Sequence, residues 1–134
     1  MKISDVMTPC PYTINSSQSI EQAVEMMTVR GIRHLPVVEN GELLGILTEQ
    51  YIKVAKTVCD TSGYCPLVGE ICQKDPLVAE SDATVADVAT EMAKEKAEVA
   101  LIADSDGNFL GIFTTNDACR VLAMLFEERE TLCK

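Results

Sequence analysis

The sequence predicts an α+β fold made of two pseudo-symmetric β-α-β-β-α repeats. The chain matches itself at an offset of 65 residues, so that Ile20 falls on Val85. The offset becomes 66 after a turn, and segment 45–48 (Gly-Ile-Leu-Thr) then falls on 111–114 (Gly-Ile-Phe-Thr). Each copy also carries helical and strand-like hydrophobic patterns in the same order. A period this long, present twice, indicates two related lobes rather than a solenoid.

Each repeat opens with a short strand pattern, at 12–14 and 77–79, and continues into an amphipathic helix. The apolar faces of the two helices consist of Ile20, Ala23, Val24 and Met27, and of Val85, Val88, Ala89 and Met92. Both helices begin with a capping-box pattern, Ser19 with Gln22 and Thr84 with Asp87. This pattern predicts where each helix starts, because the two side chains satisfy free backbone N–H groups.

Two strands joined by a glycine turn follow in each repeat, and a second helix ends it. Asn40-Gly41 and Asp106-Gly107 are typical hairpin turns. They join the predicted strands 35–38 to 43–47 and 100–103 to 109–113. The apolar positions of the last helix are Cys119, Val121, Leu122, Leu125 and Phe126, among which Cys119 is predicted to be in the core.

The predicted organisation is repeat 1 at residues 1–58, a joint at 59–68, and repeat 2 with its C-terminal helix at 69–134. Within the joint, Asp60-Thr61-Ser62-Gly63 is the predicted loop. Neither repeat buries much surface alone, so the two are expected to share one core.

Composition narrows the function classes. The chain has 134 residues, is 47% hydrophobic and has a formal net charge of −10, which disfavours DNA or an anionic membrane as a partner. No apolar run reaches the ~18–20 residues that span a bilayer, and Asp5 interrupts any signal-peptide pattern at the start. We therefore predict a cytoplasmic protein with no membrane insertion, whose six cysteines are thiols.

The repeated segments 45–51 (Gly-Ile-Leu-Thr-Glu-Gln-Tyr) and 111–117 (Gly-Ile-Phe-Thr-Thr-Asn-Asp) share their glycine, isoleucine and threonine but end differently. Asp117 follows Thr114 by three residues, whereas Tyr51 follows Thr48. Thr-x-x-Asp is itself a capping box. A helix N-terminus also favours an anion, and an ionised Asp accepts two hydrogen bonds from a vicinal diol such as that of ribose. Thr114 and Asp117 therefore predict a nucleoside clamp. An Asp117 carboxylate turned into a salt bridge or back onto its own chain, with no cavity beside it, would mean that this nucleoside pocket does not exist.

The whole chain resembles a tandem pair of cystathionine-β-synthase (CBS) domains. The segments that carry the resemblance are 6–9 (Val-Met-Thr-Pro), 31–38, 40–48, 106–114 and Asp117. The resemblance implies a regulatory module without catalytic activity, packed as a CBS-domain pair and usually homodimeric. It also implies an adenosine-containing ligand (AMP, ADP, ATP or S-adenosylmethionine) in the cleft between the repeats. No cofactor is required, and the regulated partner protein is unknown.

The resemblance also implies which residues bind the ligand. Thr114 and Asp117 match the ribose-contacting pair, and Asn116 a position near phosphate. The matches to the two adenine walls and to the basic phosphate-facing positions are Val78, Ala79, Ala97, Glu98, Val99, Arg33 and His34. Because Tyr51 replaces the aspartate, the first site, with Thr48, is predicted to be weak or empty, and Tyr51 to pack in the core.

Other chemistry has weaker support in the sequence. No nucleophile–base constellation or metal-ligand spacing is present, so neither catalytic nor metal-binding residues are predicted. Cys59, Cys65 and Cys72 lie around the joint. A disulfide between Cys59 and Cys65 is one interpretation, but separate thiols are favoured. The alternatives to a ligand sensor are a ligand-free dimerisation scaffold and a thiol or metal sensor at these cysteines.

Overall fold

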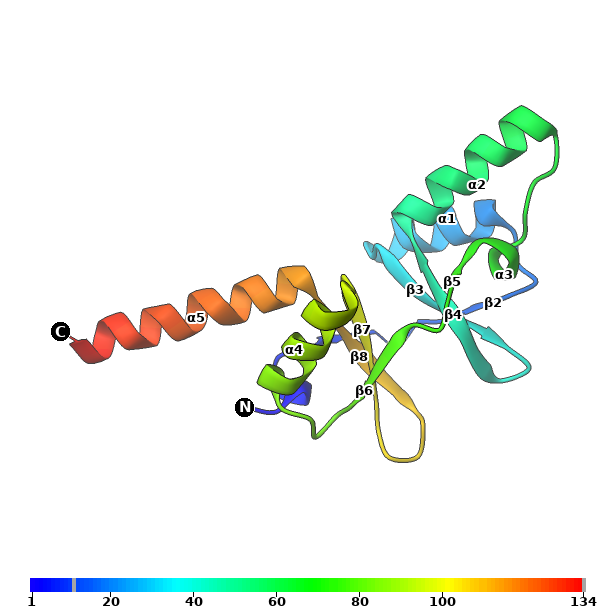
Figure 1. The fold of residues 1–134 in the computed structure, drawn as a ribbon. Coiled ribbons are helices and arrows are strands. Elements are labelled where there is room, and N and C mark those ends of the chain that lie inside the picture. Colours follow the sequence, from blue (N-terminus) through cyan, green and yellow to red (C-terminus); the bar gives the residue numbers. More distant parts are fainter. Residues whose placement is uncertain (11, 134) are drawn as a thin grey trace. The chain divides into compact units, whose positions relative to one another are not determined.

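The computed structural model describes the backbone of residues 1–10 and 12–133, and the side chains of residues 1–10 and 12–130. The chain divides into two compact units, one made of Met1–Pro11 with Leu77–Lys134 (unit 1) and one of Tyr12–Pro76 (unit 2). Each unit is an α+β structure with its own four-stranded sheet (Figure 1). The α+β class and the two related repeats predicted from the sequence are confirmed.

Unit 2 has a sheet in the order β2-β3-β4-β5, in which β2 is parallel to β3 and the other pairs are antiparallel. Its elements, in chain order, are β2 (Ile14–Asn15), α1 (Ile20–Arg30), β3 (His34–Glu39), β4 (Glu42–Thr48), α2 (Glu49–Ser62), α3 (Val68–Ile71) and β5 (Gln73–Lys74).

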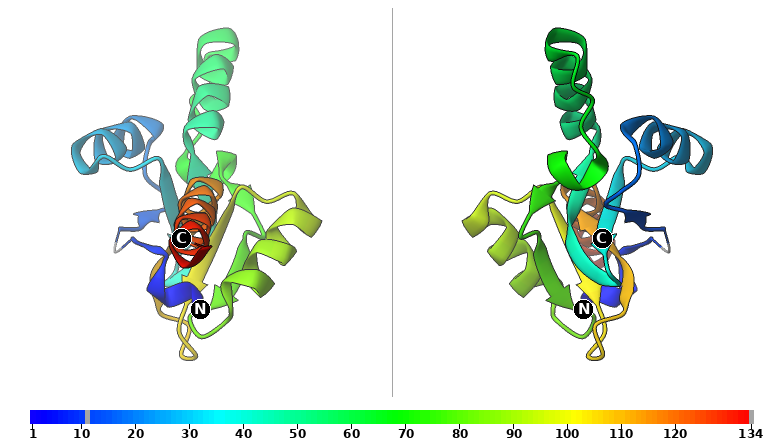
Figure 2. Two further views of the ribbon diagram at one scale, coloured as in Figure 1. Left: turned by 90° about the vertical axis from the view of Figure 1, so that its left-hand side faces the viewer. Right: turned by 90° about the vertical axis from the view of Figure 1, so that its right-hand side faces the viewer.

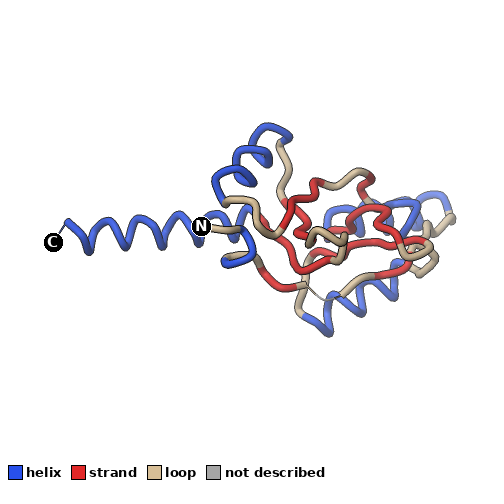
Figure 3. Tube along the Cα trace, turned by 90° about the horizontal axis from the view of Figure 1, so that it is seen from below, coloured by secondary structure: helices blue, strands red, loops and turns tan. Residues whose placement is uncertain are grey.

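Unit 1 has a sheet in the order β1-β8-β7-β6, in which β6 is parallel to β7 and the other pairs are antiparallel. Its elements are η1 (Ile3–Asp5), β1 (Thr8–Pro9), β6 (Leu77–Glu80), α4 (Val85–Glu95), β7 (Val99–Ala103), β8 (Phe109–Thr114) and α5 (Thr115–Cys133). Figure 3 shows α5 continuing well beyond the strands of this unit.

The two units match each other down to the strand register. In unit 1, Thr8 pairs with Ile112 and Pro9 with Gly111; in unit 2, β5 pairs with β4 at the equivalent positions, Gly45 and Ile46. The segment before each sequence repeat therefore completes the sheet of a different repeat. For this reason residues 1–11 belong with the second repeat, and the compact units do not coincide with the predicted sequence boundaries.

Local signals explain why the first helix of each unit starts where it does. The Ser19 hydroxyl accepts from the backbone N–H of Gln22 at 3.1 Å, and the Gln22 side chain accepts from the backbone N–H of Ser19 at 2.9 Å. In α4 the Thr84 hydroxyl accepts from the N–H of Asp87 at 3.1 Å. The predicted capping box therefore forms in full at α1, whereas at α4 only its Thr84 half is present. Both caps satisfy donors that a helix start leaves unpaired.

Each unit has its own aliphatic core between its sheet and its helices, so the expectation that the two repeats share one core is wrong. The buried residues are Ile14, Ala23, Met27, Leu35, Val37, Leu47, Ile52, Val68 and Cys72 in unit 2 and Ile3, Val88, Met92, Ala100, Ile102, Phe113 and Val121 in unit 1. The predicted apolar faces of the two helices thus point into these cores, where burial of apolar area stabilises the fold.

Two predictions about helices are wrong. The segment Asp60–Ser62 is the end of α2 rather than a loop, because the left-handed conformation that ends the helix falls on Gly63, at φ 77°. Cys119 is exposed rather than buried, and Leu122, Leu125 and Phe126 are also exposed. Within α5, the core of unit 1 takes Val121 and, at its margin, Ala118. Among the described residues, no helix combines the length and apolar composition that crossing a bilayer requires.

Candidate functional site

Thr114 lies at one end of the sheet of unit 1, where three strands place several of the predicted site residues. It pairs with Val99 at the start of β7, and Leu77 at the start of β6 pairs with the next residue, Ala100. Because β6 and β7 are parallel and β8 runs against them, the end of β8 and the starts of β6 and β7 share this sheet end. α5 begins here, immediately after Thr114.

Thr114 and Asp117 form the predicted capping box. The backbone N–H of Asp117 donates to the Thr114 hydroxyl at 3.2 Å, and the backbone N–H of Thr114 donates to Oδ2 of Asp117 at 2.9 Å. The Thr114 hydroxyl also donates to the same carboxylate oxygen at 3.1 Å. The prediction that Thr114 and Asp117 form a capping box is thus confirmed, and the two side chains lie together at the start of a helix.

The carboxylate of Asp117 has two further partners in unit 1. The Thr8 hydroxyl of β1 donates to Oδ1 at 2.8 Å, and the Arg120 guanidinium, one helical turn further along α5, donates to the same atom at 2.6 Å. Asp117 is 2% exposed. Burial alone raises the pKa of this carboxyl, but the hydrogen bonds from Thr114, Thr8 and Arg120 outweigh it and hold the pKa below its ordinary value.

These contacts bear on the ribose clamp. A carboxylate offers about four acceptor positions, and four donors from three residues reach Asp117. The carboxylate is therefore turned onto its own chain and into a salt bridge with Arg120, rather than held open as an acceptor. This meets the first part of the condition stated above against the nucleoside pocket. A ribose diol has to displace at least one of these donors. The guanidinium is the most readily displaced, because the Arg120 side chain is 60% exposed and water can solvate it.

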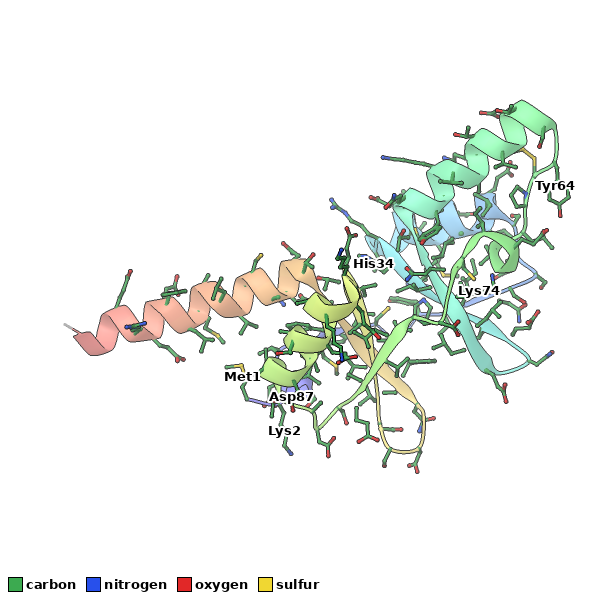
Figure 4. All side chains as sticks on the ribbon, viewed as in Figure 1. Met1, Lys2, His34, Tyr64, Lys74 and Asp87 are labelled. Carbon is green, nitrogen blue, oxygen red and sulfur yellow. A yellow bond between two sulfur atoms is a disulfide. The ribbon has the colours of Figure 1, made fainter. Side chains whose placement is uncertain are left out.

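Val78 and Ala79, the predicted first adenine wall, lie on β6 at the edge of the same sheet. Both line a cavity of about 340 Å³ between β6 and α4. The remaining lining residues are Leu77, Glu80, Asp82, Ala83, Asp87, Val88 and Glu91. Figure 4 shows Asp87 on α4, on the same side of the unit as Met1 and Lys2. Four carboxylates thus border the cavity, which makes its surroundings electronegative.

Ala97, Glu98 and Val99, the second predicted wall, lead into β7 beside Thr114. The Glu98 carbonyl accepts from the backbone N–H of Thr115 at 3.0 Å, which fixes this segment against the start of α5. Val99 is buried, Ala97 is half-buried and the Glu98 side chain is exposed. Asn116 is exposed in the first turn of α5. The second repeat therefore brings Thr114, Asp117 and this segment together.

The equivalent position in unit 2 is built differently. Thr48 precedes α2 without a side-chain capping bond, and Tyr51 packs against the core of unit 2, as predicted. His34, labelled in Figure 4, is half-buried and pairs with Thr48 across β3 and β4, while Arg33 is exposed. No carboxylate stands at position 51, so a predicted weak first site remains the expectation there.

Thr8 and Arg120 were not predicted as partners of Asp117. Thr8 is 109 residues from Asp117 along the chain, and a single contact of that kind leaves no local pattern. The repetition gives no signal for it either, because the aligned segment 71–74 (Ile-Cys-Gln-Lys) shares no identical residue with 6–9 (Val-Met-Thr-Pro). For Arg120, the spacing of three residues from Asp117 on a helix is a known pairing distance.

The cysteines at the joint are not all free thiols. Cys59 and Cys65 form a disulfide, with their Cα atoms 4.3 Å apart, so the preference for separate thiols is wrong at this pair. Gly63 turns the chain back after α2 and brings the two cysteines close enough to bond. Cys72 is a buried free thiol.

Known proteins match this chain over most of its length. The family model of the CBS domain matches residues 3–55 and 68–124. An L-aspartate semialdehyde sulfurtransferase of Methanocaldococcus jannaschii is 29% identical over 89% of this chain and 23% of that enzyme. The CBS domain-containing protein YhcV of Bacillus subtilis is 28% identical over 86% of this chain and 81% of YhcV. The chain spans about a quarter of the length of the first curated relatives it matches.

A solved structure agrees with these matches. The CBS domain pair of protein MJ0100, in complex with 5′-methylthioadenosine and S-adenosyl-L-methionine, is 27% identical. It superposes with a TM-score of 0.78, over 92% of this chain and 96% of that one. Two family matches, one in each sequence repeat, coincide with the internal repetition and with the two related sheets. The chain therefore belongs to the CBS domain family, as a tandem pair of CBS domains.

Proposed function

We propose that this CBS pair is a regulatory module that binds an adenosine-containing ligand through its second repeat and signals to a partner protein. One observation carries the proposal: Thr114 and Asp117 stand together at the start of α5, beside Glu98 and Val99. A hydroxyl and an ionised carboxylate at a helix start are suited to a ribose diol. The complex of MJ0100 with two adenosine derivatives supports the ligand class.

Binding exchanges protein donors for ligand donors in this proposal. At Oδ1 of Asp117, the ribose hydroxyls replace the Arg120 guanidinium, the Thr8 hydroxyl or both. The reciprocal backbone bonds to Thr114 remain, so α5 keeps its cap. Because Thr8 belongs to β1, such an exchange would loosen a contact between the first and last segments of unit 1. This is a route by which occupancy changes structure, since a ligand shifts an equilibrium only through differential contacts.

The charge around the candidate site favours some adenosine ligands over others. Val78 and Ala79 share their cavity with Glu80, Asp82, Asp87 and Glu91. These carboxylates repel a polyphosphate and are compatible with a neutral thioether or a cationic sulfonium. We therefore propose S-adenosylmethionine or a related thioether ahead of ATP.

A ligand panel tests this function. Calorimetric titration of the purified chain with AMP, ADP, ATP, S-adenosylmethionine and NAD should show binding of at least one adenosine compound, with S-adenosylmethionine tighter than ATP. Mass spectrometry of the protein as purified should detect any ligand retained from the cell. If no compound binds and none co-purifies, the regulatory-ligand proposal fails and the ligand-free homodimeric scaffold becomes the better account.

A further inference from the structure

The disulfide of unit 2 forms part of a cavity wall. Cys59 belongs to the end of α2 and Cys65 to the loop after it. Both line a cavity of about 430 Å³, which is further lined by Ser19, Ile20, Glu21, Ala55, Lys56, Asp60, Pro66 and Leu67. Figure 2 shows the segment after α2 returning alongside that helix to reach α3. The disulfide thus joins two walls of one cavity, α2 and the returning loop.

The loop is held independently on both sides of the disulfide. The N–H of Gly63 donates to the Cys59 carbonyl at 2.9 Å. On the other side, the N–H of Val68 donates to the Gln18 carbonyl and that of Gly69 to the Ser16 carbonyl, each at 2.9 Å. Between these anchors, the Tyr64 hydroxyl donates to Glu70, and the bond from Cys65 fixes the loop to α2. Loss of that one bond would detach Cys65 from α2, while Tyr64 still holds the loop to Glu70 of α3 and the rest of the unit stays in place.

Neither cysteine of the disulfide is buried. Cys65 is exposed and Cys59 is half-buried, and the neighbouring Tyr64 is 57% exposed. Figure 4 shows the disulfide beside Tyr64, at the far end of α2 from the sheet. Exposed disulfides are the ones that exchange with other thiols, whereas deeply buried ones are protected.

We propose that Cys59–Cys65 is a reversible thiol–disulfide exchange site that sets the position of the loop wall of this cavity. A dithiol reductant attacks the exposed Cys65 sulfur through its thiolate, so that a mixed disulfide forms and Cys59 leaves as the thiolate and takes up a proton. The second thiol of the reductant then attacks the mixed disulfide and releases Cys65 as a thiol. Two electrons pass to the protein, and the reductant becomes a disulfide. The proposal is independent of adenosine binding, whose candidate residues Thr114 and Asp117 lie in unit 1.

The test uses the full chain equilibrated with oxidised or reduced dithiothreitol. Maleimide labelling after denaturation should count four thiols in the oxidised protein and all six in the reduced one, because the disulfide ties up two of the six cysteines. Chymotrypsin should cut after Tyr64 roughly tenfold faster in the reduced protein, because cleavage requires local opening of the loop.

Two variants make the cleavage result specific. The double variant Cys59→Ser/Cys65→Ser should be cut at the fast rate under both conditions. Cys119→Ser, which removes an exposed thiol in the other unit, should respond to dithiothreitol as the unchanged chain does. The proposal would be overturned if six thiols were labelled in protein exposed only to oxidised dithiothreitol, or if the cleavage rates were equal in the two redox states.

Discussion

At Asp117, burial and hydrogen bonding act in opposite directions on the charged form. Burial disfavours the carboxylate, yet donors from Thr114, Thr8 and Arg120 compensate it. Such a group is costly to disturb, because removing the acceptor leaves several donors of unit 1 without their partner. The same residue therefore serves both the stability of unit 1 and the proposed recognition of ribose.

Replacement of Asp117 by Ala should destabilise unit 1. The Thr8 hydroxyl and the backbone N–H of Thr114 lose a charged acceptor, which corresponds to about 2–3 kcal/mol. Chemical unfolding followed by circular dichroism measures the change. Asp106→Ala is the matched control, because that carboxylate is exposed in the turn before β8, and it should change stability by less than about 0.5 kcal/mol. Equal stability of the two variants would show that the four contacts contribute nothing net.

The contribution of Asp117 should also depend on pH. Its folded-state pKa lies below the ordinary value of 3.8, so the unfolded chain binds the proton more readily than the folded one. The stabilisation is therefore fully present above that ordinary value and is lost as the pH falls through the lower folded pKa. The difference in unfolding free energy between the unchanged chain and Asp117→Asn should be constant near neutral pH and shrink below about pH 4. A difference that stays constant down to about pH 3 would contradict this linkage.

At the level of the elements, the short strands β1 and β5 explain why both repeated segments contain a glycine, Gly45 in one and Gly111 in the other. A Cβ on Gly111 would lie 2.5 Å from the Thr8 carbonyl oxygen, and a Cβ on Gly45 would meet the Gln73 carbonyl in the same way. Because the obstructing atoms are backbone, no side chain can move aside to make room. Gly111 therefore permits β1 to pair in the sheet of unit 1, and Gly45 permits β5 to pair in the sheet of unit 2.

Gly111→Ala should accordingly weaken the pairing of β1 with β8. We expect a loss of about 1–3 kcal/mol, as for other overpacking substitutions, with faster hydrogen exchange of amides in residues 1–10. Leu110→Ala, at the partly exposed neighbouring position, is the control and should leave that exchange unchanged. Normal protection of residues 1–10 in Gly111→Ala would show that the close approach is not required.

The sequence predicted the hairpins, the first helices and the capping box because each depends on residues close together in the chain. Ser19 and Gln22, or Thr114 and Asp117, are three residues apart and interact within one turn. The pairing of Thr8 with Ile112 has no such local signal, so the exchange of the initial segments was not predicted. The end of α2 was misplaced because Gly63, rather than the polar run before it, stops the helix.

Across the whole molecule, the two units share one topology but differ in the residue that ends the repeated segments 45–51 and 111–117. Unit 1 keeps Asp117, whereas unit 2 has Tyr51 packed in its core and a disulfide at the end of α2. Each unit also has its own aliphatic cluster. We infer a division of roles, with adenosine recognition in unit 1 and thiol exchange in unit 2.

Calorimetric titration of S-adenosylmethionine into the unchanged chain, Asp117→Ala and Tyr51→Phe decides whether Asp117 binds the ribose. The folded fraction of each variant at the titration temperature is checked first from its melting curve. We expect Asp117→Ala to weaken the binding of S-adenosylmethionine by roughly tenfold or more, because the ribose loses its charged acceptor. Tyr51→Phe should bind within about threefold of the unchanged chain, since the ring still fills the core. Unchanged affinity in folded Asp117→Ala, or equal losses in both variants, would contradict the account.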